Sequence, residues 1–289
     1  MVTGAASGIG RAIALALAKE GADLFLVDID RDGLAIIADE ARGHGVDVIA
    51  VVCDLADSGQ IGTALDKLRG TWNALNILVN NAGITYYGQT HLMTAEQRQR
   101  IMAVNLTAPM TLVHELLPML LSAEEAHIVN VCSIFGLATY RKAAAYQASK
   151  FGLVGFTAAL RAEYWREDFG VTALCPGFVR SALLEGCAGD RVDHAVHVPA
   201  WLSTTPEKTA ARALRAIRGD EGVVLVTPMA HLYWRLARLF PGLVDWVARE
   251  GWRRRGRMAV PPSATSSAAT GRVHAIEDYK AANARRRSG

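Results

Sequence analysis

Residues 3–10 read Thr3-Gly4-Ala5-Ala6-Ser7-Gly8-Ile9-Gly10, a glycine-rich turn. It stands between a short apolar run, Val2-Thr3, and a segment that favours a helix from residue 9 to 20. Glycines let a backbone pass close to a ligand, and the first turn of a helix offers unpaired N–H groups to an anion. The spacing G-x-x-x-G-x-G predicts a strand–turn–helix unit that receives a pyrophosphate, although tight packing without a ligand would also explain it.

Short apolar runs alternate with helix-forming segments along the rest of the chain. The near-continuous apolar character of these runs is typical of a parallel sheet with helices on both faces. We therefore expect one α/β domain with a doubly wound sheet. Its first strand would be short, and we expect the functional protein to have more apolar residues upstream. Strands are predicted at 23–28, 47–53, 75–80, 127–133, 171–175 and 222–227, and helices at 9–20, 31–43, 58–70, 94–121, 143–168 and 206–218.

The composition is that of an ordinary globular protein, with 51% hydrophobic residues, 20% charged residues and a net charge of +3. The charge is unevenly distributed, because residues 1–230 carry a net −5 and residues 231–289 a net +8. The basic character therefore belongs to the C-terminal end. No element typical of nucleic-acid binding accompanies it, so we expect no nucleic-acid partner.

Cysteines and histidines favour neither a disulfide framework nor a metal site. The four cysteines have no short paired spacing, which favours buried free thiols in a reducing, cytoplasmic compartment. His194 and His197 form an H-x-x-H without further ligands nearby, so no metal is expected. No apolar run reaches the ~20 residues of a membrane span, and the glycine-rich start is unlike a signal peptide.

Asp28 closes the second predicted strand, about twenty residues after the glycine turn. A carboxylate at that point accepts hydrogen bonds from the ribose hydroxyls of an adenosine. It would also repel a 2′-phosphate, and neither Ser7 nor Ile29 supplies a compensating cation. Asp28 therefore favours NAD(H) and leaves NADP(H) open, with simple surface solvation as the alternative for this carboxylate.

The next two predicted strands end in polar or small residues. Asp54-Leu55 follows the third strand, and Asp54 is placed to bond an adenine amino group. Asn80-Asn81-Ala82-Gly83 follows the fourth strand, where small residues would let a dinucleotide lie across the strand end. Ordinary turn chemistry would explain this tetrapeptide equally well.

Tyr146 and Lys150 stand four residues apart in a helix-forming segment, so both project from one helix face. A phenol titrates near pH ~10 in water and is a poor acid–base catalyst at neutrality. A neighbouring ammonium favours the phenolate and lowers that pKa toward the working range. The pair is a candidate acid–base centre, although the same spacing also arises by chance on solvated helices.

In order and spacing, one set of residues resembles the short-chain dehydrogenase/reductase family across residues 1–230. The set comprises Thr3–Gly10, Asp54, Asn80–Gly83, Asn105, Ser133, Tyr146, Lys150 and Pro176-Gly177. The resemblance implies one Rossmann-type domain with a mostly seven-stranded parallel sheet. It also implies a homodimer or homotetramer formed through the two long helices, 94–121 and 143–168.

The resemblance also implies catalytic roles. Tyr146 would be the acid–base group, and Lys150 would bond the nicotinamide ribose and depress the Tyr146 pKa. Ser133 would hold the substrate oxygen, and Asn105 would support a water that relays protons to Lys150. A buried serine at a strand end and a helix-interior amide are the simpler readings of these last two residues.

Pro176-Gly177-Phe178-Val179-Arg180-Ser181 resembles the family's segment beside the nicotinamide carboxamide, with Ser181 in place of a frequent Thr. Pattern and resemblance together give one set of cofactor-binding candidates. These are Thr3, Gly4, Ser7, Gly8, Ile9, Gly10, Asp28, Asp54, Leu55, Asn81, Ala82, Gly83, Tyr146, Lys150, Pro176, Gly177, Val179 and Ser181.

Three regions are expected: a catalytic domain at 1–228 with a substrate lid at about 182–205, a basic amphipathic helical arm at 229–258, and a disordered tail at 259–289. The residues expected to form an apolar substrate pocket are Tyr86, Tyr87, Phe135, Tyr140, Leu183, Leu184, Val198 and Trp201. Core packing is the alternative for several of these aromatics. The pocket predicts a hydrophobic secondary alcohol or ketone, such as a steroid-like, retinoid-like or long-chain compound.

The arm mixes aromatic residues with arginines, and Pro241-Gly242 should divide it into two short helices. Such a helix suits the surface of a membrane, a lid over the active site or a subunit contact. For the whole chain, an NAD(P)(H)-dependent oxidoreductase is the leading hypothesis. The alternatives are an NADPH-dependent 3-ketoacyl-type reductase and a dinucleotide-binding sensor or scaffold without turnover.

Overall fold

A computed structural model describes residues 1–139, 141–165, 168–180, 188–189, 203–240, 242 and 246. The chain divides into two compact units, Met1–Val244 and Asp245–Gly289, and the elements below belong to the first. Several sequence predictions lie outside the described residues. They concern Tyr140, Ser181, Leu183, Leu184, Cys187, His194, His197, Val198, Trp201, most of the proposed lid at 182–205, most of the arm beyond 240, and the tail at 259–289.

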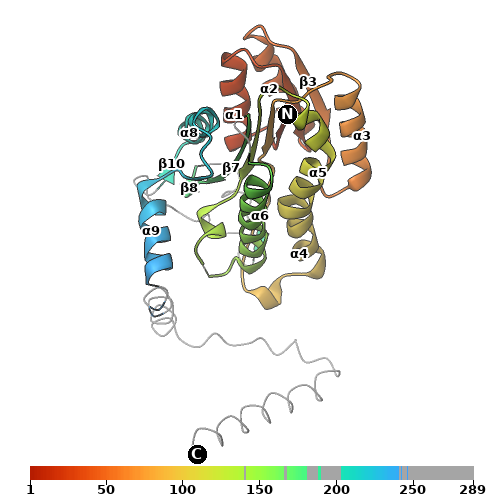
Figure 1. Cartoon of the computed structure of the whole chain (residues 1–289). Coiled ribbons are helices and arrows are strands. Elements are labelled where there is room, and N and C mark those ends of the chain that lie inside the picture. The colour runs from red at the N-terminus through yellow and green to blue at the C-terminus, as the bar shows by residue number, and fades with distance from the viewer. Residues whose placement is uncertain are drawn as a thin grey trace, which may run out of the picture. The chain divides into compact units, whose positions relative to one another are not determined.

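Seven parallel strands form the central sheet, in the order β11-β7-β6-β4-β1-β2-β3 (Figure 1). Strand order reverses between β1 and β4, which makes the crevice where ligands bind in sheets of this kind. The predicted doubly wound Rossmann-type fold with a short first strand is therefore confirmed. The strands are β1 Val2–Thr3, β2 Leu24–Asp28, β3 Val48–Val52, β4 Ile77–Asn80, β6 Ala126–Val131, β7 Phe169–Cys175 and β11 Val223–Leu225.

Helices cover both faces of the sheet. Buried side chains of α1 (Gly8–Lys19), α2 (Arg31–Arg42) and α8 (Pro206–Arg218) share one core cluster with the sheet. Those of α3 (Ser58–Arg69), α5 (Ala108–Leu121) and α6 (Ala144–Glu163) share the cluster on the opposite face (Figure 1). In β2, Leu24 and Leu26 belong to the first cluster, whereas Phe25 and Val27 belong to the second. This alternation explains why the strands read as unbroken apolar runs.

Side-chain caps explain where most of these helices begin. Asp30 accepts a hydrogen bond from the Gly33 amide at the start of α2, and Asp57 accepts from the Gly59 and Gln60 amides at the start of α3. Threonines cap α4 (Ala95–Met102), α8 and α9 (Pro228–Leu239), whereas α1, α5 and α6 have no side-chain cap. Each cap satisfies an amide that would otherwise lack a partner in the first turn.

The predicted helix at 94–121 is interrupted. A π-helical turn at Ala103–Thr107 separates α4 from α5 and carries Asn105. Among the described residues, Ala95–Leu121 is long and apolar enough by composition to cross a membrane, a feature that the sequence analysis did not expect. Leu112, Leu116 and Leu120 of this segment are nevertheless buried in the core of the domain, so we regard it as a core helix.

Helix α6 is shorter than predicted and ends at Glu163, not at residue 168. Tyr164, the residue after the helix, packs against Phe169 at the start of β7, with 5.9 Å between ring centroids. The sequence analysis also missed four two-residue strands, which are too short to show any periodicity. These pair as β5 (Tyr86–Tyr87) with β9 (Ala188–Gly189) and β8 (Phe178–Val179) with β10 (Ser203–Thr204), and two 3₁₀ helices span Thr90–Leu92 and Ile134–Gly136.

Strand β1 is only two residues long but lies at the centre of the sheet, paired with β2 and β4. Met1 extends it, because the Val79 amide donates to the Met1 carbonyl at 2.9 Å and the Met1 amine donates to the Ile77 carbonyl at 2.7 Å. Burial lowers the pKa of this amine to about 5. The terminal residue is thus part of the core.

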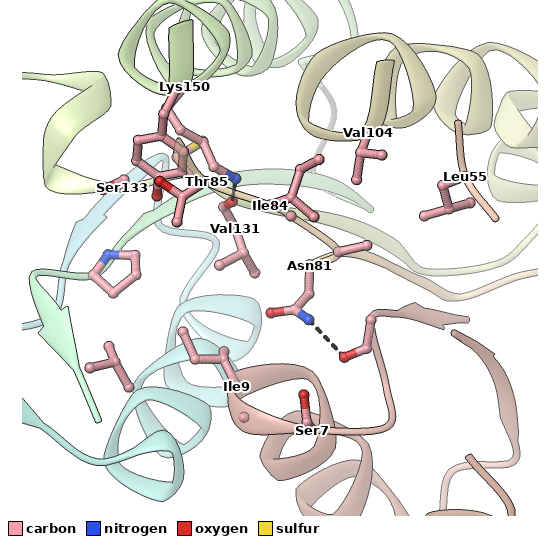
Figure 2. Close-up of a pocket in the computed structure, with 18 of the residues that line it drawn as sticks. Ser7, Ile9, Leu55, Asn81, Ile84, Thr85, Val104, Val131, Ser133 and Lys150 are labelled. Carbon is pink, nitrogen blue, oxygen red and sulfur yellow. Dashed lines mark hydrogen bonds between the residues drawn. The ribbon is translucent and has the colours of Figure 1, made fainter. Parts of the chain in front are cut away.

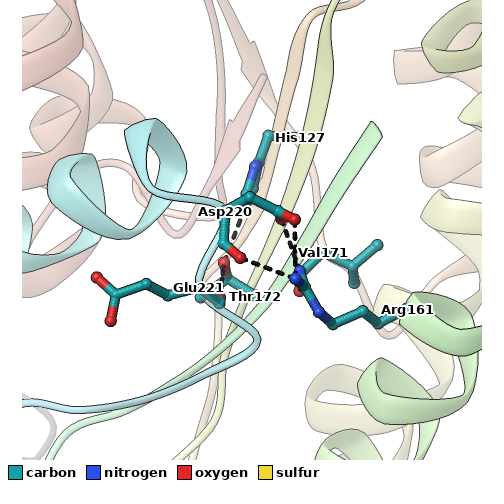
Figure 3. A network of polar contacts seen from close by, with 6 residues as sticks. All are labelled: His127, Arg161, Val171, Thr172, Asp220 and Glu221. Atoms are coloured by element: carbon teal, nitrogen blue, oxygen red, sulfur yellow. Dashed lines mark hydrogen bonds and ion pairs between the residues drawn. The ribbon is translucent and has the colours of Figure 1, made fainter. Parts of the chain in front are cut away.

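A network of polar contacts lies at the amino-terminal ends of β6 and β7 (Figure 3). The His127 imidazole Nε2 lies 2.8 Å from the Thr172 hydroxyl, which donates to the Glu221 carbonyl at 2.6 Å. The Arg161 guanidinium binds both carboxylate oxygens of Asp220, at 2.6 and 2.8 Å. Burial lowers the pKa of His127 to about 4, so this imidazole is neutral at pH 7.

Candidate active site

A cavity of about 320 Å³ lies at the carboxyl ends of the central strands (Figure 2). Figure 2 shows Ser133, Thr85 and the Lys150 amine together on one side, with Asn81, Ile9 and Ser7 across from them. Most of the candidate residues line this one cavity. They are Gly4, Ser7, Gly8, Ile9, Asp28, Asp54, Leu55, Asn81, Ala82, Gly83, Ser133, Tyr146, Lys150, Pro176, Gly177 and Val179.

The glycine turn forms one wall and requires its glycines. Gly4 and Gly8 have φ angles of +63° and +55°, in the left-handed region that favours glycine. A Cβ on Gly10 would lie 2.0 Å from the Gly4 carbonyl oxygen, so α1 can approach the turn only without a side chain there. Gly10 therefore shapes the turn from outside the cavity.

The N-terminus of α1 opens onto the same cavity. Ser7 precedes α1 and makes no side-chain cap bond, unlike the residues that cap α2, α3, α4, α8 and α9. The amides in the first turn of α1 and the positive end of its dipole are thus available to an anion. The turn has the chemistry that a dinucleotide pyrophosphate needs.

Thr3 and Asn81 fasten the turn to the end of β4. The Thr3 hydroxyl accepts from the Asn81 and Ala82 amides at 3.0 and 3.1 Å. The Asn81 side-chain amide donates to the Thr3 and Gly4 carbonyls, both at 3.0 Å. Thr3 is itself buried and acts through these bonds instead of lining the cavity.

Asp28 fastens the turn to β2 and faces the cavity. Its carboxylate accepts from the Ala6 amide at 2.8 Å and from the Asp30 amide at 3.0 Å. Asp30 instead caps α2, so the two neighbouring carboxylates have separate functions. Asp28 is the one that remains at the cavity wall.

Asp54 also lines the cavity, but its carboxylate is already engaged. It accepts from the Ala56 amide at 2.9 Å and pairs with the Arg100 guanidinium at 2.9 Å. Arg100 extends from α4 and lines the cavity itself, yet sequence reasoning did not single it out. A separation of 46 residues between the partners hides such a pair from any local pattern.

Lys150 is 4% exposed and donates from its ammonium to the Val131 carbonyl at 2.8 Å. Burial lowers the pKa of this ammonium below its usual range, while the nearby thiols of Cys132 and Cys175 act in the opposite direction. The ammonium nitrogen lies 6.0 Å from the centre of the Tyr146 ring. Both side chains therefore reach the cavity from one face of α6, as their spacing predicted.

Ser133 lies two residues after the end of β6 and lines the cavity beside these two residues. Its hydroxyl oxygen accepts from the Phe135 amide at 3.1 Å and so caps the 3₁₀ helix Ile134–Gly136. This bond fixes the oxygen while the hydroxyl proton can be donated. The arrangement suits a group that orients a second oxygen.

Asn105 lies behind the cavity wall in the π-helical turn, a feature that is frequent at functional sites. Its side-chain oxygen accepts from the Ile84 amide at 2.8 Å, and its nitrogen donates to the Ile84 carbonyl at 2.9 Å and to Ser149 at 3.1 Å. A Cβ on Gly83 would lie 3.4 Å from this oxygen and 3.5 Å from the Lys150 nitrogen. The amide thus joins the end of β4 to α6.

Comparisons with known proteins agree with this geometry. The sequence profile described as short chain dehydrogenase matches residues 1–190.

The chain belongs to the short chain dehydrogenase family.

A protein of Streptomyces violaceoruber, named as ketoacyl reductase 1 of the granaticin polyketide synthase, is 40% identical over 187 residues, which cover 64% of this chain and 69% of that protein. A short chain dehydrogenase/reductase of Burkholderia phymatum in complex with NAD superposes with a TM-score of 0.76 at 27% identity, covering 84% of this chain and 93% of that one. A short-chain dehydrogenase of Sphingobium yanoikuyae in complex with NADPH gives 0.72 at 26%, covering 92% and 98%.

As a short chain dehydrogenase, the protein is an oxidoreductase that acts on CH–OH groups with a nicotinamide dinucleotide. The glycine turn, the open start of α1 and the buried ammonium of Lys150 fit such a cofactor. Besides Arg100, nine lining residues were not among the candidates: Ile29, Cys53, Ile84, Thr85, Val104, Val131, Cys132, Ala143 and Phe178. Ile84 and Thr85 directly follow Asn80–Gly83, so extending that motif by two residues would have found them.

Of the residues expected to form the substrate pocket of this short chain dehydrogenase, Tyr87 and Phe135 line the cavity, together with Phe178. The Phe135 and Phe178 rings meet edge to face with 5.8 Å between centroids. Tyr86, also predicted, is buried in the described structure but does not line the cavity.

Proposed function

We propose that this short chain dehydrogenase interconverts a hydrophobic secondary alcohol and its ketone, with NAD(H) as the preferred cofactor. The convergence of Ser133, Tyr146 and Lys150 on one cavity beside an aromatic wall is the observation that carries the proposal. Steroid-like, retinoid-like and long-chain compounds are the substrate classes that suit this wall.

The proposed chemistry assigns a proton to Tyr146. Its phenol takes the hydroxyl proton during alcohol oxidation and returns it during ketone reduction, while the bound nicotinamide accepts or supplies the hydride. The Lys150 ammonium stabilises the phenolate, and Ser133 donates a hydrogen bond to the reacting oxygen. Because Asn105 already binds Ile84 and Ser149, it acts mainly by holding the walls in place, with its oxygen still able to accept from a relaying water.

Two features support an apolar substrate. The described side chains beside Ser133 and Tyr146 include Tyr87, Phe135 and Phe178. The two cations among the described lining residues, Arg100 and Lys150, already bind protein oxygens. Arg100 is paired with Asp54, and Lys150 is the group proposed to bind the cofactor ribose, so neither is proposed as an anchor for a carboxylate or phosphate of a substrate.

Asp28 supports the preference for NAD(H). Its carboxylate at the cavity wall would accept from ribose hydroxyls and repel a 2′-phosphate. Arg100 neutralises Asp54 instead of Asp28, so the negative charge at the ribose position remains. The solved relatives include one with NAD and one with NADPH, so the preference of this chain has to be measured.

An NADPH-dependent 3-ketoacyl-type reductase is the second candidate, favoured by the 40% identity to the Streptomyces protein. The two candidates differ in cofactor and in substrate, so one experiment separates them. Steady-state rates with NADH and NADPH are measured against apolar ketones, apolar alcohols and 3-ketoacyl thioesters. Higher kcat/KM for NADPH with the thioester would favour the second candidate and contradict the first.

A dinucleotide-binding sensor is the third candidate, and it predicts binding without turnover. NADH would then quench or enhance protein fluorescence while its absorbance stayed constant with every substrate. Consumption of NADH with any ketone of the panel excludes this candidate.

A homodimer or homotetramer is proposed through the helices α4–α5 and α6. Met110 and Leu121 of α5 and Phe151 of α6 are large apolar side chains that remain exposed in the single chain. Light scattering of Phe151→Glu would give a smaller particle than the wild type if this surface is an interface. The buried free thiols of Cys53, Cys132 and Cys175 favour a cytoplasmic location.

A further inference from the structure

Helix α9 has one face that packs against the domain. Ala230 is buried, and Tyr233 and Trp234 pack on the core cluster that contains Leu225 and Phe135. The Tyr233 hydroxyl donates to the Thr139 carbonyl, and Thr227 caps the helix by accepting from the Ala230 amide at 3.2 Å. These contacts fix which side of the helix is turned outward.

The outward face combines large apolar side chains with arginines. Met229, Leu232 and Leu239 are 39%, 51% and 68% exposed, and Phe240 directly after the helix is 56% exposed. Leu232, Arg235 and Leu239 follow one another at spacings of three and four residues, so they form one stripe along the helix. Arg238 is also exposed, with its guanidinium 5.9 Å from the Trp234 ring centre.

The charge on this stretch has a single sign. Residues 228–240 contain Arg235 and Arg238 and no Asp or Glu. The sequence beyond it stays basic on balance, since residues 241–258 hold five arginines against Asp245 and Glu250. By contrast, residues 1–230 carry a net negative charge, so the basic character is confined to this end of the chain.

We propose that the face of α9 formed by Met229, Leu232, Arg235, Arg238, Leu239 and Phe240 docks the protein onto an anionic lipid surface. Leucine and phenylalanine side chains enter the boundary between headgroups and acyl chains, while the arginines bind the phosphates and carboxylates of the headgroups. A purely apolar partner would leave the arginines unpaired. A purely acidic soluble partner would leave four large apolar side chains without a partner.

The test is co-sedimentation of the full chain with vesicles of phosphatidylcholine alone or with phosphatidylserine added. Binding is expected to the anionic vesicles, to fall as salt rises, and to be at least tenfold weaker on phosphatidylcholine alone. The double variant Arg235→Gln with Arg238→Gln should lose on the order of tenfold in binding to the anionic vesicles. The double variant Leu232→Glu with Leu239→Glu should lose binding to both kinds of vesicle, those of phosphatidylcholine alone and those with phosphatidylserine.

Matched controls come from other helices of the same domain. Arg215→Gln with Arg218→Gln removes two exposed arginines at the same spacing on α8, and Ile36→Glu changes an equally exposed apolar side chain on α2. Both controls should bind vesicles as the wild type does. Circular dichroism and NADH binding check that each variant is folded, and the arginine pair decides if the leucine variant does not fold.

Two outcomes would overturn the proposal. In the first, the α9 arginine variant binds anionic vesicles as tightly as the wild type and as the α8 control. In the second, wild-type protein fails to bind anionic vesicles, while light scattering shows that the leucine variant forms a smaller oligomer. The face would then be a contact between copies of this chain.

Discussion

The two ends of strand β6 each hold a buried basic side chain, and their surroundings differ. At the amino end, the His127 imidazole lies against Thr172, and the neighbouring Arg161 is bound by both oxygens of Asp220. A Cβ on Gly170 would lie 2.1 Å from the second imidazole nitrogen, so no room is left beside the ring. The pocket at this end is lined by Asn76, Glu124, Glu125 and Asp168, and not by His127 or Arg161.

At the carboxyl end, the Lys150 ammonium binds the Val131 carbonyl and faces a cavity. Among the described residues, that carbonyl accounts for one of its three N–H donors. Ser133 and Tyr146 line the same cavity. A perturbed pKa occurs at both ends, so burial of a titratable group alone does not indicate function; the adjacent space does.

The largest effect is expected at the carboxyl end. Tyr146→Phe should lower kcat by about a thousandfold, because an acid–base group contributes roughly 10²–10⁴-fold. NADH affinity should stay close to that of the wild type, since the ring remains. Stopped-flow or steady-state absorbance measures the first, and fluorescence titration the second. Tyr164→Phe, directly after the same helix and outside the cavity lining, is the control and should keep full activity.

At the amino end we expect a pH-dependent stability without an effect on catalysis. The folded pKa of His127 is about 4 against 6.5 in the unfolded chain, so the unfolded state binds more protons between these values. The free energy of unfolding should therefore decrease as pH falls from 6.5 to 4, by about 3 kcal/mol. Urea unfolding at several pH values measures it.

His127→Gln should remove this contribution, so its stability should vary less with pH over the same window. The difference between the two proteins cancels the buried Met1 amine, which both retain. Parallel pH curves for the variant and the wild type would contradict the assignment. Activity at pH 7 should be unchanged, because His127 lies at the far end of β6 from the cavity.

A smaller effect is expected at the cofactor wall. Asp28→Asn keeps an oxygen that can accept from the Ala6 amide but removes the charge. The ratio of kcat/KM for NADH to that for NADPH should fall about tenfold, because a hydrogen bond to a charged group is worth about 1.5–3 kcal/mol. Asp30→Asn, which caps α2 two residues away, should leave the ratio unchanged.

The smallest effect belongs to the ion pair at the amino end. Arg161→Met removes the bonds to Asp220 and to the Val171 carbonyl, and Asp220 is half-exposed and can bind water instead. The free energy of unfolding should fall by about 1 kcal/mol, with kcat/KM unchanged. A loss of activity greater than the loss of stability would show that the two ends of β6 are coupled.

The parts of the fold that were predicted correctly are those with a local pattern in the sequence. The apolar runs gave every strand of the central sheet, and the glycine turn gave the start of α1. The π-helical turn around Asn105 and the strands of two residues were not predicted, because neither has a periodicity of its own. The end of α6 at Glu163 was not predicted either, and the Tyr164–Phe169 contact beside it joins residues that no local pattern connects.

The candidate site followed the same division. Residues at strand ends, such as Asp28 and Ser133, could be located because parallel strands bring their carboxyl ends to one edge. The Arg100–Asp54 pair could not, since it joins α4 to the end of β3 across 46 residues. Asp30 and Asp57 cap their helices, whereas Ser7 makes no side-chain cap bond at the start of α1. This difference could be seen only in the structure.

Helix α6 is hydrogen-bonded to the sheet at two points along its axis. Near one end, the Lys150 ammonium donates to the main chain of β6, and eleven residues further along the helix the Arg161 guanidinium donates to the main chain of β7. Because the two bonds are made to neighbouring strands, they oppose both rotation of α6 about its axis and translation along it. The orientation of the Tyr146 phenol is thereby set by α6 and the sheet. The sequence of the surrounding loops can change without changing that orientation.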